Sequence, residues 1–149
     1  MHFQRNKIYN IIMATISAKY LGNLRSEATH NQSGNKIITD APLDNNGRGE
    51  AFSPTDLLCA ALGTCMMTIM GIVANKEGIT LDGTIYTIIK TMQAQPRKVA
   101  KISIHFVVKS NAKLTEIQKD KLINAAENCP VALSLSSDLD QESSFDFVS

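Results

Sequence analysis

Alternating apolar and polar residues predict short strands in the first third of the chain. The alternation runs from Thr15 to Leu21, and a period of two is typical of a half-buried strand. Gly22-Asn23 then gives a turn signal, so Leu24 to Thr29 is expected to form the second arm of a hairpin. Lys36 to Thr39 predicts a third short strand. Residues 44–49, which include two glycines, predict an irregular loop.

A long apolar segment follows and predicts a buried helix. Ser53-Pro54-Thr55-Asp56 combines a capping serine, a proline suited to the first turn and an early acidic residue, which indicates a helix start. The helix is expected to run to about Lys76, with Gly78 as a stop signal. Leu57 to Ala74 is 18 residues long and carries no charge. The predicted helix is therefore apolar on nearly all sides and must be covered.

The same uncharged segment meets the minimum length of a membrane span. Gly63, Thr64, Thr68 and Gly71 weaken its apolar character. Its ends carry no aromatic belt and no bias of positive charge, which membrane helices usually show. The strands elsewhere in the chain also need an apolar element to cover them. We therefore interpret the segment as the core helix and expect no membrane partner.

Two long strands and a final strand are predicted in the second half of the chain. Residues 84–92 and 101–109 are strand candidates joined by a loop that contains Pro96. In residues 101–109 alternate positions are apolar, which predicts one buried face. These positions are Ile102, Ile104, Phe106 and Val108. Residues 143–148 predict a short strand at the end of the chain.

Two further helices are predicted between these strands. Apolar residues from Leu114 to Ala125 recur at helical spacing, which predicts an amphipathic helix. Thr115 and Gln118 have the spacing of a capping box at its start. Cys129 stands directly before Pro130, so a short helix through Leu135 is expected to begin there, with Cys129 as its cap.

Length and charge limit the classes of protein to consider. With 149 residues the chain is long enough for one domain with a proper core. We expect a single domain over residues 13–149 and a loose extension over residues 1–12, with the true start at Met1 or Met13. The chain has 15 Lys and Arg against 14 Asp and Glu, a formal net charge of +1. This balance gives no electrostatic argument for a nucleic-acid partner.

The three cysteines indicate redox chemistry more than structural crosslinks. An odd count is not typical of a secreted disulfide scaffold, so we expect a reducing cytoplasm, where a disulfide is transient. Cys59 and Cys65 are six residues apart on the long helix and point to different faces. They are not expected to pair or to share a metal, and no metal-ligand spacing is present. Cys59 is interpreted as a thiol that fills the core.

Cys65 and Cys129 remain as candidates for chemistry. Cys65 is deep in the long helix, where apolar burial alone raises the pKa of a thiol. A reactive Cys65 therefore needs a cation from elsewhere, and Arg25 is the candidate. Cys129 at a helix start has backbone N–H groups nearby, which favour a thiolate. The alternative interpretations are an exposed arginine for Arg25 and a plain capping residue for Cys129.

These residues resemble the OsmC/Ohr family of thiol-dependent hydroperoxide reductases. Residues 52–65, FSPTDLLCAALGTC, are similar to the family's central-helix signature, which ends in the reactive cysteine. Residues 128–131, NCPV, are similar to its second cysteine segment. The resemblance covers about residues 13–149. It implies an α+β fold in which antiparallel sheets wrap around long central helices of an intertwined homodimer, with sites at the subunit interface.

The resemblance also implies a cysteine-based peroxidase that acts in oxidative and osmotic stress defence. Cys65 is the expected peroxidatic thiolate, which attacks a small organic hydroperoxide and becomes a sulfenic acid. Cys129 is expected to condense with it to a disulfide that a dithiol reductant reopens. Arg25 corresponds to the family arginine that lowers the pKa of the first thiol. No metal, haem, flavin or other cofactor is expected.

One position departs from the family pattern. The hydroperoxide-resistance branch has a glutamate directly after the proline, where it orients the arginine, and this chain has Thr55 there. Asp56 and Glu50 are the candidate replacement carboxylates, and neither occupies the equivalent position. The departure puts the rate and the substrate preference in doubt.

Two other functions stay open. A non-catalytic dimer that binds a small apolar ligand in its interface cleft, or that senses redox state, fits the same fold, because fold does not fix function. A Cys–His acyl hydrolase would use His30 or His105 as base. His105 is expected on the polar side of its strand and His30 in a loop, and no sequence signature supports acyl chemistry.

Overall fold

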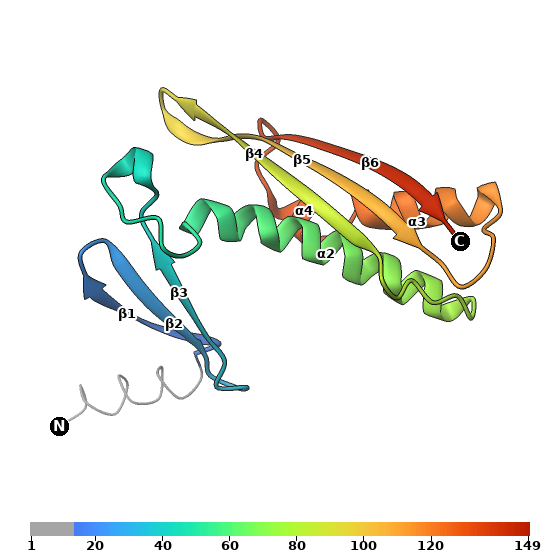
Figure 1. Cartoon of the computed structure of the whole chain (residues 1–149), viewed down its shortest axis with the longest axis horizontal. Coiled ribbons are helices and arrows are strands. Elements are labelled where there is room, and N and C mark those ends of the chain that lie inside the picture. The colour runs from blue at the N-terminus through green and yellow to red at the C-terminus, as the bar shows by residue number, and fades with distance from the viewer. Residues whose placement is uncertain (1–13) are drawn as a thin grey trace, which may run out of the picture. The chain divides into compact units, whose positions relative to one another are not determined.

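A computed structural model describes residues 14–149 of the chain (Figure 1). The chain forms two compact units, one that ends at Pro54 and one from Thr55 to Ser149, and each is described by itself. The extension expected at residues 1–12 lies outside the described residues. The single domain expected over residues 13–149 stays a prediction.

The first unit is a three-stranded antiparallel sheet with the order β1-β2-β3. Its elements are β1 (Ile16–Gly22), β2 (Arg25–His30), β3 (Lys36–Asp40) and the short 3-10 helix η1 (Leu43–Asn45). The predicted hairpin and third strand are confirmed. The turn between β1 and β2 places Gly22, Asn23 and Leu24 at φ angles of 86°, 51° and 61°. The glycine suits this left-handed region, whereas a leucine seldom adopts it.

This sheet buries few apolar side chains within a single chain. Ile16, Tyr20 and Ile37 are at least half exposed. In the part of this unit that the structure describes, Asp40 and Ser53 are the buried residues. A sheet of three short strands without an apolar core needs cover to be stable.

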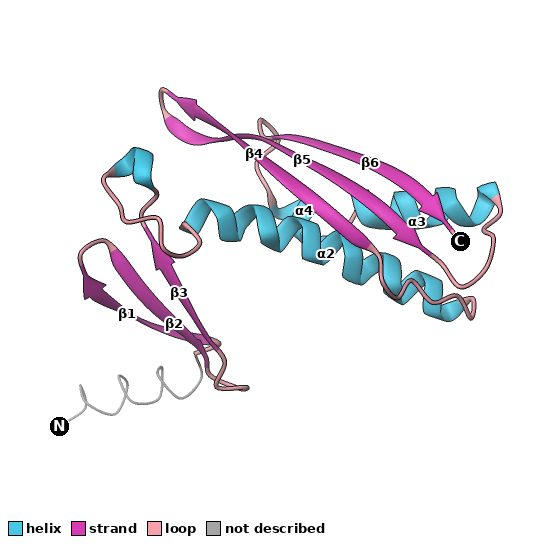
Figure 2. Cartoon of the chain, viewed as in Figure 1, coloured by secondary structure: helices cyan, strands magenta, loops and turns pink. Residues whose placement is uncertain are grey.

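The second unit combines one sheet with three helices (Figure 2). Its elements are α2 (Pro54–Lys76), β4 (Ile85–Ala94), β5 (Arg97–Lys109), α3 (Glu116–Glu127), α4 (Pro130–Ser134) and β6 (Asp140–Val148). The sheet order is β4-β5-β6, in which β4 is antiparallel and β6 parallel to β5. The sheet is therefore mixed, and the expected α+β class is confirmed.

The core of the second unit lies between the helices and the inner face of β5. The four alternate apolar residues predicted on β5, Ile102, Ile104, Phe106 and Val108, are at most 2% exposed. α2 approaches β4 closely at Gly63, where an added Cβ would lie 2.6 Å from Cδ1 of Ile88. Phe106 stacks between Tyr86 and Phe145, with ring centroids 5.1 Å apart on each side. The alternation along β5 thus sets which face of the sheet the helices cover.

The two shorter helices begin as the sequence predicts. In α3 the side chain of Thr115 accepts from the backbone N–H of Gln118, and the side chain of Gln118 accepts from the N–H of Thr115. This reciprocal pair is a capping box. In α4 Pro130 is the first helical residue and Cys129 is the cap.

α2 has one buried and one exposed face in the single chain. The buried stripe consists of Cys59, Leu62, Gly63, Met66, Met70 and Ala74. The opposite stripe is exposed and consists of Leu58, Ala61, Thr64, Thr68, Ile72 and Asn75. By length and composition alone α2 could also cross a membrane, with a mean hydropathy of 2.1 over its most apolar window, a third of which is buried. The core of a soluble protein meets the same criterion, so this is weak evidence for a span.

Candidate active site

Cys129 is held at the start of α4 and is completely buried. Its Sγ accepts a hydrogen bond from the N–H of Ala132 at 3.5 Å. Burial raises the pKa of the Cys129 thiol, whereas the N–H of Ala132 acts in the opposite direction. The helix start therefore favours the thiolate as predicted, but the cost of burying a charge outweighs it.

The structure brings Cys65 and Cys129 together. Besides burial, the thiol of Cys65 raises the pKa of Cys129, so the two cysteines lie close together. Both thiols are free, and Cys65 is partly exposed. Sixty-four positions separate them in sequence, with Cys65 on α2 and Cys129 at the start of α4. Proximity of two thiols is the first requirement of a disulfide-forming pair.

Cys59 lies apart from this pair, on the buried face of α2. It is 3% exposed and belongs to the core cluster. Burial raises the pKa of its thiol, while the charge of Lys90 lowers it and that of Asp56 raises it. A buried thiol with a raised pKa is chemically inert, in agreement with its interpretation as a core residue.

Arg25 opens β2 in the first unit and is held by two carboxylates. Its Nε donates to Oδ1 of Asp40 at 2.7 Å, and its Nη2 donates to Oδ2 of Asp40 at 2.8 Å. The same Nη2 donates to Oε2 of Glu50 at 2.7 Å. These carboxylates raise the pKa of Arg25 further, and Arg25 holds the pKa of Asp40 below its ordinary value. Arg25 is therefore a fixed cation, not a plain exposed arginine.

The two candidate carboxylates have different surroundings. Glu50 contacts Arg25, as described above. Asp56, in the first turn of α2, accepts from Nζ of Lys90 at 2.5 Å. The same Nζ donates to Oγ1 of Thr55 at 2.9 Å. The first turn of α2, where the family has its glutamate and this chain has Thr55, is thus hydrogen-bonded to β4 through Lys90.

Asp40 is the site residue that the sequence analysis missed. It pairs directly across from Arg25 in the β2–β3 ladder and is 1% exposed. A buried acid almost always has a charged partner. The signal in the sequence was an aspartate at the end of a predicted strand, but its partner depends on the strand register.

The two histidines of the hydrolase alternative have hydroxyl groups as neighbours. Nδ1 of His30 is 2.7 Å from Oγ of Ser33, at the end of β2. His105 is on the outer face of β5, with Nδ1 2.8 Å from Oγ of Ser144 and Nε2 3.4 Å from Asp146. Within residues 14–149, neither histidine is hydrogen-bonded to a cysteine. The arrangement does not support a Cys–His pair.

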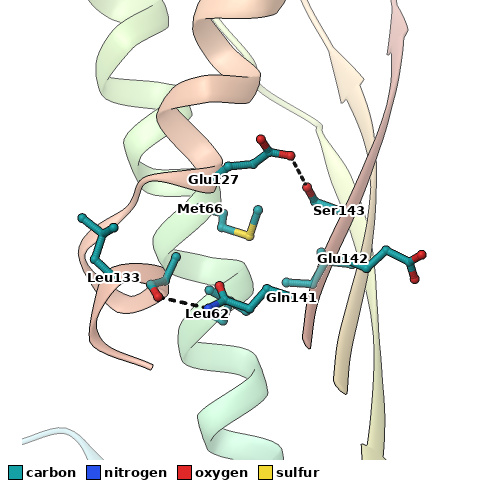
Figure 3. Close-up of a pocket in the computed structure, with 9 residues that line it drawn as sticks. Leu62, Met66, Glu127, Leu133, Gln141, Glu142 and Ser143 are labelled. Carbon is teal, nitrogen blue, oxygen red and sulfur yellow. Dashed lines mark hydrogen bonds between the residues drawn. The ribbon is translucent and has the colours of Figure 1, made fainter. Parts of the chain in front are cut away.

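A cavity of about 440 Å³ opens in the second unit beside α4 (Figure 3). Its lining mixes apolar and polar side chains, and Glu127 accepts a hydrogen bond from Ser143 there. The nine residues that line it are Leu62, Met66, Ile104, Glu127, Ala132, Leu133, Gln141, Glu142 and Ser143. The sulfur atoms of Cys65 and Cys129 are not part of this lining.

The fold and the neighbouring thiols define an α+β protein of the OsmC-like class. The family model described as OsmC-like protein matches residues 47–143, well over half of the chain. The chain therefore belongs to the OsmC-like family, as the resemblance predicted. No curated protein matched the chain.

Solved structures of similar proteins agree with this membership. A Psychrobacter arcticus protein, named for osmotic stress induction and a detoxification response, is 44% identical, with a TM-score of 0.84 over 89% of this chain and 96% of that one. A Legionella pneumophila organic hydroperoxide resistance protein is 23% identical, with a TM-score of 0.66 over 90% and 98%. OhrB of Bacillus subtilis, another such protein, is 19% identical, with a TM-score of 0.60 over 91% and 99%. The last two likenesses concern the fold alone.

Proposed function

We propose that the protein is a thiol-dependent peroxidase that reduces small organic hydroperoxides in defence against oxidative and osmotic stress. The observation that carries the proposal is the proximity of the partly exposed Cys65 to the buried Cys129. Family membership and the names of the Legionella and Bacillus proteins support the substrate class, and the name of the Psychrobacter protein supports the role in stress. Three free thiols agree with action in a reducing cytoplasm.

The chemistry needs only the two thiols and an external dithiol. The Cys65 thiolate attacks the terminal peroxide oxygen, so an S–O bond forms, the O–O bond breaks and the alkoxide takes up a proton to leave as an alcohol. The Cys129 thiol then attacks the sulfenic acid, which forms a disulfide and releases water. A dithiol reductant reopens this disulfide by two exchange steps and is itself oxidised to a disulfide.

In this proposal Arg25 supplies the positive charge beside Cys65. An opposite charge within about 4–6 Å lowers the pKa of a thiol, against the effect of apolar surroundings. Arg25 is always protonated and its guanidinium is held in place by carboxylates, so it is suited to this role. Assembly of the units of two chains into a homodimer is proposed to complete the site.

The exposed stripe of α2 supports the dimer. Its middle consists of Ala61, Thr64 and Thr68, which are small, and the hydroxyls of Thr64 and Thr68 donate to the carbonyls of Ala60 and Thr64 at 2.8 Å. The stripe therefore presents methyl groups, and its small side chains allow a second helix to approach closely. The sheet of the first unit also supports a dimer, because it leaves apolar side chains exposed that a partner would cover.

The test is peroxide consumption by the reduced full-length protein with an alkyl hydroperoxide and a dithiol. Cys65→Ser is expected to abolish turnover, because it removes the nucleophile. Cys129→Ser is expected to allow one oxidation that leaves a sulfenic acid on Cys65, detected with a sulfenic-acid reagent. Cys59→Ser is the matched control and should turn over like the wild type. Equal consumption by the wild type and Cys65→Ser would refute the proposal.

The second candidate function is binding of a small ligand without catalysis. The cavity beside α4 favours it, because its volume is in the range of small-molecule sites and apolar residues form part of its lining. A pure binding protein would consume no hydroperoxide, and Cys65→Ser would leave ligand binding unchanged. The same assay therefore separates the two functions.

A further inference from the structure

Asp40 makes a two-point contact with Arg25 from a buried position. Its two oxygens accept from Nε and Nη2 at 2.7 and 2.8 Å, which is the parallel geometry of a bidentate pair. The backbone N–H of Glu50 donates to Oδ2 of Asp40 at 3.1 Å, so the carboxylate is fixed in turn. Two parallel bonds set the plane and the direction of a guanidinium, which one bond does not.

Glu50 contributes less to the position of the guanidinium. Its side chain is 59% exposed and accepts one hydrogen bond, from the Nη2 that Asp40 already engages. An exposed single contact is mobile and screened by solvent. Of the two carboxylates, Asp40 is the one that limits the motion of Arg25.

Nη1 of Arg25 is the part of the guanidinium that remains available. Within residues 14–149, Arg25 makes its hydrogen bonds through Nε and Nη2. The hydrogen-bonding capacity of Nη1 is therefore not used by these carboxylates. With Asp40 holding the opposite edge, this N–H pair is presented in a fixed direction.

The segment of the family glutamate does not provide an equivalent anchor. Position 55 is a threonine, which has no charge, and Lys90 engages both Thr55 and Asp56. The chain therefore lacks an acid at the family position and has a buried acid on β3 that contacts the arginine.

We propose that Asp40 is the positioning residue for Arg25 and replaces the family glutamate that this chain lacks. The inference rests on the proposed function, in which Arg25 stabilises the Cys65 thiolate. In this proposal Asp40 acts only through Arg25, whose guanidinium it holds in one orientation. A cation fixed in advance stabilises a charge without rearranging during the reaction.

The sign of the effect on Cys65 separates positioning from a simple charge effect. Loss of a negative charge near the site, by itself, makes a thiolate easier to form and lowers the thiol pKa. Loss of the position of Arg25 withdraws the cation and raises the thiol pKa. The two explanations predict opposite shifts for the same isosteric substitution.

The experiment is Asp40→Asn in the full-length protein, with the alkylation rate of Cys65 measured against pH by peptide mass spectrometry. The apparent pKa of Cys65 is expected to rise, and the rate constant for hydroperoxide at neutral pH to fall about tenfold. Glu27→Gln is the matched control, because Glu27 is a β2 carboxylate that pairs with Lys19 and Lys36 on the same sheet. It should leave both measurements unchanged.

Arg25→Ala separates failure of the inference from failure of the proposed function. If Arg25→Ala leaves the alkylation profile of Cys65 unchanged, Arg25 has no role at the thiol. Both the proposed role of Arg25 and the inference about Asp40 then fail. If Arg25→Ala raises the pKa while Asp40→Asn leaves it unchanged or lowers it, only the inference about Asp40 is overturned.

A second variant applies if Asp40→Asn does not fold. Arg25→Lys keeps the positive charge but cannot make two parallel bonds to one carboxylate. It is expected to raise the apparent pKa of Cys65 nearly as far as Arg25→Ala. A wild-type profile in Arg25→Lys would show that charge alone is sufficient, and would overturn the inference.

Discussion

At the scale of single residues, two neighbouring thiols differ in what surrounds them. Cys129 has the N–H groups of a helix start but no exposed surface, whereas Cys65 is partly exposed in the middle of α2. For Cys129 the cost of burying a charge exceeds the gain from the helix start. A thiol kept neutral in this way is suited to be the second to react, since it is not itself open to the oxidant.

This contrast predicts the pH dependence of labelling at Cys129. A raised pKa means that the thiolate fraction at a given pH is smaller than in a free cysteine, so labelling by iodoacetamide shifts to higher pH. We expect Cys129 to label slowly up to its ordinary value of 9.0 and to accelerate only above it. The measurement is mass spectrometry of the alkylated peptide across pH 6 to 11. Protein unfolded in urea is the control and should show the ordinary profile; the same profile in folded protein would contradict the prediction.

At the scale of elements, the first turn of α3 depends on its capping box. Thr115→Ala removes the acceptor for the N–H of Gln118, and loss of such a cap costs about 1 kcal/mol of unfolding free energy. Urea unfolding followed by circular dichroism measures this loss. Glu116→Gln is the control, because it removes an exposed ion pair with Lys119 worth about 0.5 kcal/mol at most. Equal losses of unfolding free energy in the two variants would show that the cap contributes no more than an exposed ion pair.

Local sequence patterns predicted most of the elements. The apolar alternation along β5, the capping box of α3 and the proline at the start of α4 depend on neighbours within a few residues, and each is confirmed. The parallel pairing of β6 with β5 was not predicted, because pairing between distant strands leaves no local signal. The burial of α2 was predicted on all sides, but one chain covers only one face of it.

The residues of the candidate site that can be recognised one at a time were predictable from the sequence. Cys65 and Cys129 were recognisable by their motifs, and Arg25 by its place near the start of the second strand. Asp40 was not, because its contact with Arg25 depends on the register of β2 and β3. The net effect on the Cys129 thiol was also missed, since burial is a property of the packed core and not of the helix start.

At the scale of the whole molecule, a single chain leaves large apolar side chains exposed to solvent. Leu58 and Ile72 on α2 are 37% and 47% exposed, and Ile16 and Tyr20 on β1 are 60% and 67% exposed. Surfaces of this kind mark interfaces in soluble proteins. A helix with apolar residues on all sides fits a core shared by two chains, because each chain then covers what the other exposes.

The proposed homodimer predicts the effect of a charge on the exposed stripe of α2. We expect the wild type to have the mass of a dimer in light scattering after size exclusion. Ile72→Asp is expected to shift this mass toward a monomer at micromolar concentration, because an unpaired carboxylate in an apolar interface costs several kcal/mol. Ile117→Asp is the matched control: Ile117 on α3 is 70% exposed and lies off the stripe, so this variant should stay dimeric. A dimeric Ile72→Asp would show that the interface lies elsewhere. A monomeric wild type would show that no such interface forms. If the dimer completes the site, the monomeric variant should also lose peroxide turnover while both thiols remain free.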